Sequence, residues 1–314
     1  MVIPSLRSVS TVVGILLCTF NGERYLREQL DSFMAQTHED WRLFVSDDGS
    51  TDSTLGILEA YQRVLGDRLT VMQGPRKGFG QNFLSLIRNT AVTADTYAFS
   101  DQDDIWLPDK LERSIAALQG MHDTLPCLYC SRTQLINENG QITGLTPLFR
   151  KSPGFRNALV QSLAGANTMM INEAARTLLA RTELDAPIVA HDWLAYLVVS
   201  GCGGYVAYDP QPTLLYRQHR DNLIGANAGL RSRLNRFSKM LGGRFKSWNE
   251  KNIKILNNYS SSLTPESRLL LTHFQALRGP RLMGRIVALR AAGFYRQTVA
   301  GTLSLYVAVI LRQV

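Results

Sequence analysis

The chain has 314 residues, of which 45% are hydrophobic and 19% are charged. This composition is typical of a globular protein with a sizeable core and excludes a disordered chain. Four scattered cysteines are too few for a disulfide-stapled secreted domain. We expect all four to be reduced core residues, because the single C-x-x-C pair has no second pair to complete a zinc site. They are Cys18, Cys127, Cys130 and Cys202.

The formal net charge of +8 is unevenly distributed. Residues 231–314 contain 15 Lys or Arg and two acids, a balance of +13, so the first 230 residues carry −5. An acidic body joined to a basic C-terminal region suggests that this region meets an anionic surface, either a membrane or a nucleic acid.

No signal peptide or membrane span is predicted. The N-terminal sequence lacks a long apolar stretch, and the uncharged stretch 297–311 has 15 residues where a span needs about 20. We expect a cytoplasmic protein that lies peripherally on a membrane. If 282–295 is one helix, Arg281 and Arg285 share a face that could contact the lipid.

Strands and helices alternate over the first hundred residues. Apolar runs predict strands at 12–17, 42–46, 69–72 and 97–100, and helical spacing of apolar residues predicts a helix after each of the first three. This alternation indicates a parallel α/β sheet with right-handed crossovers. Ligands bind at the carboxyl ends of the strands in such sheets, so the residues that follow each strand are candidate site residues.

Acidic residues follow the second and the fourth predicted strands. They are Asp47, Asp48, Asp101, Asp103 and Asp104. Mutual repulsion makes such a cluster costly unless a ligand offsets it, and carboxylates suit Mg²⁺ or Mn²⁺ when substrate phosphates complete the coordination. The segment 48–50 alone could be a turn before a helix cap. Two acidic clusters at one edge of a sheet favour a ligand-binding site over a simple turn.

The middle of the chain has a different pattern. Asn139-Gly140 between apolar segments predicts a hairpin, with strands at 128–136 and 141–145. Further strands are expected at 166–171 and 205–208, and a helix at 194–199.

Several polar residues in this pattern have two interpretations. Asp192 could be the N-cap of the helix that follows it, and His219 could be an ordinary half-buried histidine. The glycines of the segment 76–80 could form a plain loop, or they could let backbone amides and Lys77 approach a phosphate.

Together these motifs resemble the inverting glycosyltransferases of family 2, which have the GT-A fold. The resemblance covers residues 12–227 and rests on motifs in the family's order. These are Cys18-Thr19-Phe20-Asn21, the segment 47–52 (DDGSTD), Asp101-Gln102-Asp103, Asp192 and His219. The string at 100–106 (SDQDDIW) is similar to the bacterial rhamnosyltransferase-like subgroup. The resemblance implies a Rossmann-like, mainly parallel catalytic domain at 1–227 and a basic helical region at 228–314.

The resemblance also implies roles for individual residues. Predicted contacts to the donor nucleotide are Thr19, Asn21, Asp48 and Asp101, with Lys77 as a further candidate for the phosphates. Asp48 would accept a hydrogen bond from the base, and Asp101 would face the ribose or the donor sugar. Predicted ligands of Mg²⁺ or Mn²⁺ are Asp103 and His219, and the predicted general base is Asp192. Trp106 and Trp193 either stack on a sugar ring or belong to the core.

Two positions depart from the family's pattern. The first motif commonly has Pro-x-Tyr-Asn, where this chain has Cys18-Thr19-Phe20-Asn21. The catalytic acid is often preceded by Glu, whereas His191 precedes Asp192 here. The histidine either tunes the pKa of its neighbour or packs.

The predicted reaction is a single displacement, which needs one base and a stabilised diphosphate leaving group. The subgroup suggests dTDP-L-rhamnose as donor, with UDP- or GDP-sugars as alternatives, and a lipopolysaccharide core or other surface or lipid-linked glycan as acceptor. A nucleotidyltransferase would carry a Gly-rich basic loop after the first strand, where the segment 18–22 has one Gly and no Lys. The basic region lacks a recognisable RNA motif, so we expect no nucleic-acid partner.

Overall fold

The computed structural model describes residues 11–219 and 243–314. In these residues nine strands form one sheet in the order β3-β2-β1-β4-β8-β6-β9-β5, with β7 paired to β6. The strands are β1 (Val13–Thr19), β2 (Trp41–Asp47), β3 (Leu69–Gln73), β4 (Thr96–Ser100), β5 (Ile105–Trp106), β6 (Cys127–Ile136), β7 (Ile142–Leu145), β8 (Met170–Asn172) and β9 (Tyr205–Arg217). β1 pairs in parallel with β2 and β4, and β6 with β9, while β8 runs antiparallel to its neighbours. The sheet is therefore mixed but mainly parallel.

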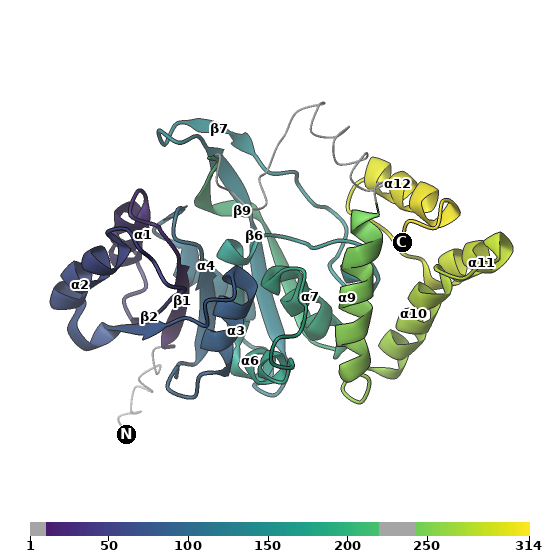
Figure 1. The fold of residues 1–314 in the computed structure, drawn as a ribbon, viewed down its shortest axis with the longest axis horizontal. Helices are drawn as coiled ribbons and strands as arrows, with labels where there is room; N and C mark the ends of the chain where they lie inside the picture. Colours follow the sequence, from purple (N-terminus) through teal and green to yellow (C-terminus); the bar gives the residue numbers. More distant parts are fainter. Residues whose placement is uncertain (1–10, 220–242) are drawn as a thin grey trace, which may run out of the picture.

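Helices cover both faces of this sheet (Figure 1). Successive side chains of a strand point to opposite faces, so β1 contributes Leu16 to one buried cluster and Ile15 and Leu17 to the other. One face is covered by α3 (Phe79–Arg88), α6 (Glu173–Ala180) and α7 (His191–Gly201), and the short α5 (Phe155–Ala158) belongs to the same cluster. The other face is covered by α1 (Leu26–Met34), α2 (Thr54–Leu65) and α4 (Lys110–Leu118). The unbroken apolar run of β1 is explained by burial on both faces.

Most of the predicted elements are confirmed, including the hairpin of β6 and β7 around Asn139-Gly140. The strand predicted at 166–171 is partly wrong, because residues Ala166–Thr168 form a 3₁₀ turn in which Thr168 donates to the Gly165 carbonyl. The strand predicted at 205–208 continues to Arg217. Its pairing with β6 shifts register near the prolines, which cannot donate to the ladder. All four cysteines carry free thiols.

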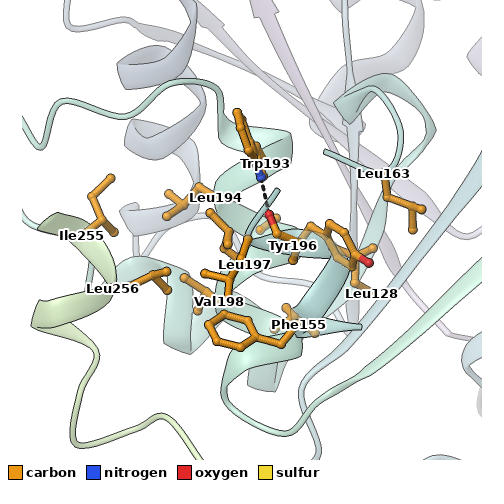
Figure 2. Close-up of a cluster of buried hydrophobic side chains, with 14 of the residues drawn as sticks. Leu128, Phe155, Leu163, Trp193, Leu194, Tyr196, Leu197, Val198, Ile255 and Leu256 are labelled. Carbon is orange, nitrogen blue, oxygen red and sulfur yellow. Dashed lines mark hydrogen bonds between the residues drawn. The ribbon is translucent and has the colours of Figure 1, made fainter. Parts of the chain in front are cut away.

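The C-terminal helices gather at one end of the molecule (Figure 1). They are α9 (Arg244–Asn258), α10 (Pro265–Ala276), α11 (Leu282–Ala292) and α12 (Val299–Ile310). Figure 2 shows Ile255 and Leu256 of α9 beside Leu197 and Val198 of α7, within one buried cluster that extends to Leu305 of α12. The helical region predicted after residue 227 is thus built onto the α7 face of the sheet, although the boundary itself lies outside the described residues.

The basic face predicted for the end of the chain is wrong in one respect. Arg285 is buried rather than exposed, and its guanidinium donates to the carbonyls of Gly279, Pro280 and Ile310. The helix predicted over 282–295 ends at Ala292, because Gly293 adopts a left-handed conformation. Within the described ranges, no helix has the length and apolar character needed to cross a membrane.

Two leucines of α12 test whether this helix is part of the core. Leu305 is fully buried and Leu303 is 59% exposed. We predict that Leu305→Ala lowers the free energy of unfolding by about 2–5 kcal/mol, because it leaves a cavity. Leu303→Ala should change it by about 0.5 kcal/mol or less. Urea unfolding of both variants measures the difference, and equal effects would show that α12 is not packed as described.

Candidate active site

A cavity of about 1430 Å³ opens at the carboxyl ends of the parallel strands. Its walls come from the loops after β1, β2 and β4, from β6 and from the start of α7. Most of the predicted site residues line it, although they are far apart in the sequence. They are Thr19, Asn21, Asp48, Asp101, Asp103, Asp192 and His219.

Asp48 is fixed by the loop that precedes α3. One carboxylate oxygen accepts the backbone N–H of Arg76 at 2.6 Å, and the other accepts that of Gly78 at 2.8 Å. Arg76 and Gly78 have φ values of 57° and 84°, in the left-handed region. Each oxygen keeps a free lone pair, so the carboxylate can still accept a bond from a ligand. The backbone N–H groups of Arg76 and Gly78, which could have approached a phosphate, instead donate to Asp48 and orient its carboxylate.

Thr19 and Asn21 join the loops after β1 and β2. The Thr19 hydroxyl donates to Asp47 Oδ2 at 2.8 Å, and Asn21 Oδ1 accepts the backbone N–H of Thr51 at 2.8 Å. The Asn21 N–H in turn donates to the Ser50 hydroxyl at 2.9 Å. The two loops are therefore held as one wall of the cavity.

Gln102 attaches the loop after β4 to this wall. Its side chain accepts the Phe20 N–H at 2.9 Å and donates to the Phe20 carbonyl at 3.0 Å. A Cβ at Gly22 would lie 2.3 Å from Gln102 Oε1, so only glycine leaves room for the contact. Sequence reasoning missed this role, since Gln102 occupies the variable position of the Asp-x-Asp motif.

Asp103 and His219 meet at the centre of the cavity. Their side chains come from the loop after β4 and from the end of β9, and His219 Nε2 lies 2.7 Å from Asp103 Oδ2. Across residues 11–219 and 243–314, this site included, no group of three or more His, Cys, Asp or Glu is placed to hold a metal ion by itself. One carboxylate and one imidazole fit a site for Mg²⁺ or Mn²⁺ that a substrate diphosphate completes.

A buried polar network lies directly beneath this pair. Asp104 is fully buried and accepts the backbone N–H of Arg217 at 3.1 Å and the amide of Asn167 at 2.5 Å. The Arg217 guanidinium donates to the Asp103 carbonyl at 3.0 Å and to Glu28 Oε2 at 2.7 Å. Burial, with the nearby carboxylates of Asp103 and Asp101, raises the pKa of Asp104 well above its usual range. The sequence pointed to Asp104 as an acid but not to its function of joining two chain segments.

Asp192 also lines the cavity, from the first turn of α7. The helix begins at His191 and its N-cap is Ala190, so Asp192 is not the capping residue. Burial raises the pKa of Asp192 to about 6. The Trp193 N–H donates to its Oδ1 at 2.7 Å and the Ser162 hydroxyl to its Oδ2 at 3.3 Å, and both bonds favour the charged form and so oppose this rise in the pKa. Burial and the carboxylates of Asp103 and Asp192 raise the pKa of Asp101 to about 7. With Asp48, four aspartates thus line one cavity, and a bound cation would stabilise their negative charge.

His191 packs rather than tuning the acid beside it. Its ring stacks on Phe83 with centroids 3.8 Å apart and meets Phe79 and Phe99 edge-on. Burial lowers the pKa of His191 to about 3, so the ring stays neutral and supplies no positive charge to Asp192. Neither ring nitrogen has a hydrogen-bond partner among the described residues.

Three candidate residues do not reach the cavity. Trp106 is buried against Phe33 in an edge-to-face contact at 4.7 Å. Trp193 is a core residue whose indole N–H donates to the Ala158 carbonyl at 2.7 Å (Figure 2). Of the two alternatives, both tryptophans are therefore core residues and do not stack on a sugar bound in the cavity. Lys77 is exposed and pairs with Asp185 at 2.7 Å, outside the cavity lining.

The fold and the carboxylate-lined cavity define a GT-A glycosyltransferase, and comparison with known proteins gives its family. Residues 14–178 match the model of glycosyl transferase family 2, so the chain belongs to this family. It is 29% identical over 252 residues to the dTDP-rhamnosyl transferase RfbG of Shigella flexneri, a match that covers 77% of this chain and 83% of that protein. The predicted rhamnosyltransferase-like resemblance is confirmed.

Two solved structures share the fold. S. aureus TarS (1–349), in complex with UDP-GlcNAc, has a TM-score of 0.55 and 16% identity, and the match covers 95% of this chain and 90% of that one. The mannosyltransferase PcManGT from Pyrobaculum calidifontis, in complex with GDP-Man and Mn²⁺, has a TM-score of 0.54 and 13% identity, with 98% and 86% covered. The predicted GT-A fold is thus confirmed, including a helical C-terminal region.

The contact between Gly22 and Gln102 provides a test of how the cavity is held. Gly22→Ala displaces Gln102, and Gln102→Ala removes the same contact, so each should raise the KM for the sugar donor by a similar factor. The double variant should be no worse than either single variant, because both changes remove one shared interaction. Steady-state kinetics of the three variants measure this coupling, and additive losses would contradict it.

Proposed function

We propose that this chain is an inverting, metal-dependent transferase that moves L-rhamnose from dTDP-L-rhamnose to a hydroxyl group of a lipopolysaccharide core or another surface glycan. The observation that carries the proposal is the single cavity that brings Asp48 and Asp103 together with Asp192. Asp48 would accept a hydrogen bond from the nucleotide, and Asp103 would be a ligand of a diphosphate-bound cation. Asp192 would offer its carboxylate to a sugar hydroxyl.

The donor is proposed from the similarity to RfbG. RfbG is named as a dTDP-rhamnosyl transferase, and its match extends over 77% of the chain. UDP- and GDP-sugars remain the alternatives, since the complexes of TarS and PcManGT hold UDP-GlcNAc and GDP-Man. At 16% and 13% identity, these two structures indicate the fold of this chain but do not indicate its sugar donor. Membership of family 2 disfavours the nucleotidyltransferase alternative.

The nucleotide would bind along the wall formed by the loops after β1 and β2. Asp48 is oriented by two backbone N–H groups and keeps lone pairs for the base N–H. Thr19 and Asn21 shape this wall through their bonds to the neighbouring loop, and Asp101 would face the ribose or the donor sugar.

Asp192 is proposed as the general base. With a pKa of about 6, its carboxylate is ionised at neutral pH and yet basic enough to accept a proton from an acceptor hydroxyl. The Ser162 hydroxyl donates to Oδ2 and the Trp193 N–H donates to Oδ1, so each oxygen keeps a further lone pair for the acceptor. A single displacement needs one such base, and the product then has the inverted anomeric configuration.

Asp103 and His219 would hold Mg²⁺ or Mn²⁺ together with the donor diphosphate. Bound there, the ion supplies a Lewis acid for the negative charge that develops on the leaving group. The 2.7 Å contact between His219 Nε2 and Asp103 Oδ2 supports this proposal, because it brings the two side chains together in the cavity.

The acceptor is proposed to be a surface or lipid-linked glycan, met at the inner face of the bacterial cytoplasmic membrane. The large cavity leaves room for an acceptor sugar beside a nucleotide sugar.

Donor turnover tests the proposed function. The purified chain should hydrolyse or transfer from dTDP-L-rhamnose with Mn²⁺ or Mg²⁺, and more slowly from UDP- and GDP-sugars. EDTA should abolish turnover. Asp103→Ala should do the same without unfolding the protein, because it removes one of only two proposed metal ligands. Full activity of Asp103→Ala in EDTA would contradict the metal site, and preference for a UDP- or GDP-sugar would contradict the donor.

A further inference from the structure

An exposed apolar stripe runs along α12. Val299, Leu303, Tyr306 and Ile310 recur at the spacing of one helix face, and each is 43–73% exposed. The opposite face of the same helix is buried through Leu305 and Val309. The helix contains no charged residue in its 12 positions. Large apolar side chains gathered on one exposed face mark a binding surface more often than scattered single residues do.

Exposed arginines lie in the same C-terminal segment as this stripe. Arg281 and Arg290 of the α11 segment and Arg312 after α12 are exposed, and Met283 and Val287 of α11 add further exposed apolar side chains. Arg285 and Arg296 do not contribute, because their guanidinium groups donate to backbone carbonyls inside the fold. No Asp or Glu follows Glu266 in the sequence. The segment 279–314 therefore exposes apolar and cationic side chains and has no acidic residue of its own.

This chemistry fits an anionic bilayer better than a second copy of the chain. Apolar side chains of an interfacial helix enter the boundary between headgroups and acyl chains, and arginines at its edge pair with anionic headgroups. Two copies that met through the stripe would instead bring their arginines together, with no acid in 279–314 to pair with them.

Hydrogen bonds also connect the start of α12 to the segment that contacts Asp192. Just before α12, the Arg296 guanidinium donates to the Val160 carbonyl at 3.1 Å and the Gln297 N–H donates to Gln161 Oε1 at 2.9 Å. The next residue, Ser162, donates to Asp192. A bilayer on which α12 docks would thus be connected, through a few hydrogen-bonded residues, to the position proposed for the acceptor hydroxyl.

We propose that the exposed face of α12, with Arg281, Arg290 and Arg312, docks on an anionic lipid bilayer, and that the enzyme takes acceptors anchored in that bilayer. The docking surface is independent of the reaction chemistry, whereas the acceptor class rests on the proposed function.

Vesicle co-sedimentation of the full chain tests the docking. The wild-type chain should bind phosphatidylcholine vesicles that contain phosphatidylglycerol at low salt, and should bind pure phosphatidylcholine vesicles weakly. Leu303→Gln with Ile310→Gln should weaken binding at least tenfold, since both side chains leave the lipid boundary. Each of Arg281→Gln, Arg290→Gln and Arg312→Gln should cost about fivefold and reduce the sensitivity to salt.

Matched controls come from exposed side chains far from α12 in the sequence. Val64→Gln and Leu184→Gln, at positions 75% and 79% exposed, should leave vesicle binding unchanged. Arg63→Gln is the control for the arginines. All these variants should keep the wild-type rate of donor hydrolysis in solution, because none of them lines the cavity.

Three outcomes would overturn the proposal. The first is a wild-type chain that ignores anionic vesicles at low salt, and the second is equal loss of binding in the control variants. The third is a concentration-dependent dimer that Leu303→Gln dissociates, which would make the stripe an interface between copies. Vesicle binding without turnover of any sugar donor would leave the docking intact and contradict the proposed function instead.

Discussion

The geometry of the site depends on the hydrogen bonds of the buried Asp104 carboxylate. This carboxylate accepts hydrogen bonds from the backbone N–H of Arg217 and from Asn167, and so joins the loop after β4 to the end of β9. Arg217 adds a bond to the Asp103 carbonyl and an ion pair to Glu28 of α1. A buried polar network of this kind is costly unless its members are paired, which restricts these segments to one arrangement. Asp103 and His219 come together because the residues beside them are fixed.

The rest of the cavity is organised in the same way, with polar side chains bonded to loops rather than left for a ligand. Asp48 orients the loop before α3, and Asn21 and Gln102 link the loops after β1, β2 and β4. The ligand-facing groups are therefore preorganised by neighbouring bonds, which reduces the ordering cost when a nucleotide sugar binds. The high pKa of Asp101, raised by burial and by the neighbouring carboxylates, follows from placing several acids around one space.

The sequence predicted the parallel half of the fold well and the buried contacts poorly. Apolar runs located β1, β2, β3 and β4, and the run of β1 is unbroken because this strand is buried on both faces. The turn at 166–168 and the long β9 were harder, since each depends on local hydrogen bonds and on a shift of register that no periodicity records. The acidic clusters were visible because they follow strands. The partners of Asp104 were not, because Arg217 is 113 residues away along the chain. The packing of Trp106 and Trp193 likewise required the tertiary structure.

The assignment of Asp192 as the base is the central chemical claim, and the pH dependence of kcat/KM tests it most directly. This profile should rise with pH as Asp192 loses its proton, with a midpoint near its pKa of about 6. Ser162→Ala removes a hydrogen bond to the charged carboxylate, so it should move the midpoint to higher pH. Asp192→Asn should reduce transfer by about 10²-fold or more and leave donor binding within a few-fold of wild type. A fully active Asp192→Asn enzyme, or a midpoint that Ser162→Ala leaves in place, would contradict the account.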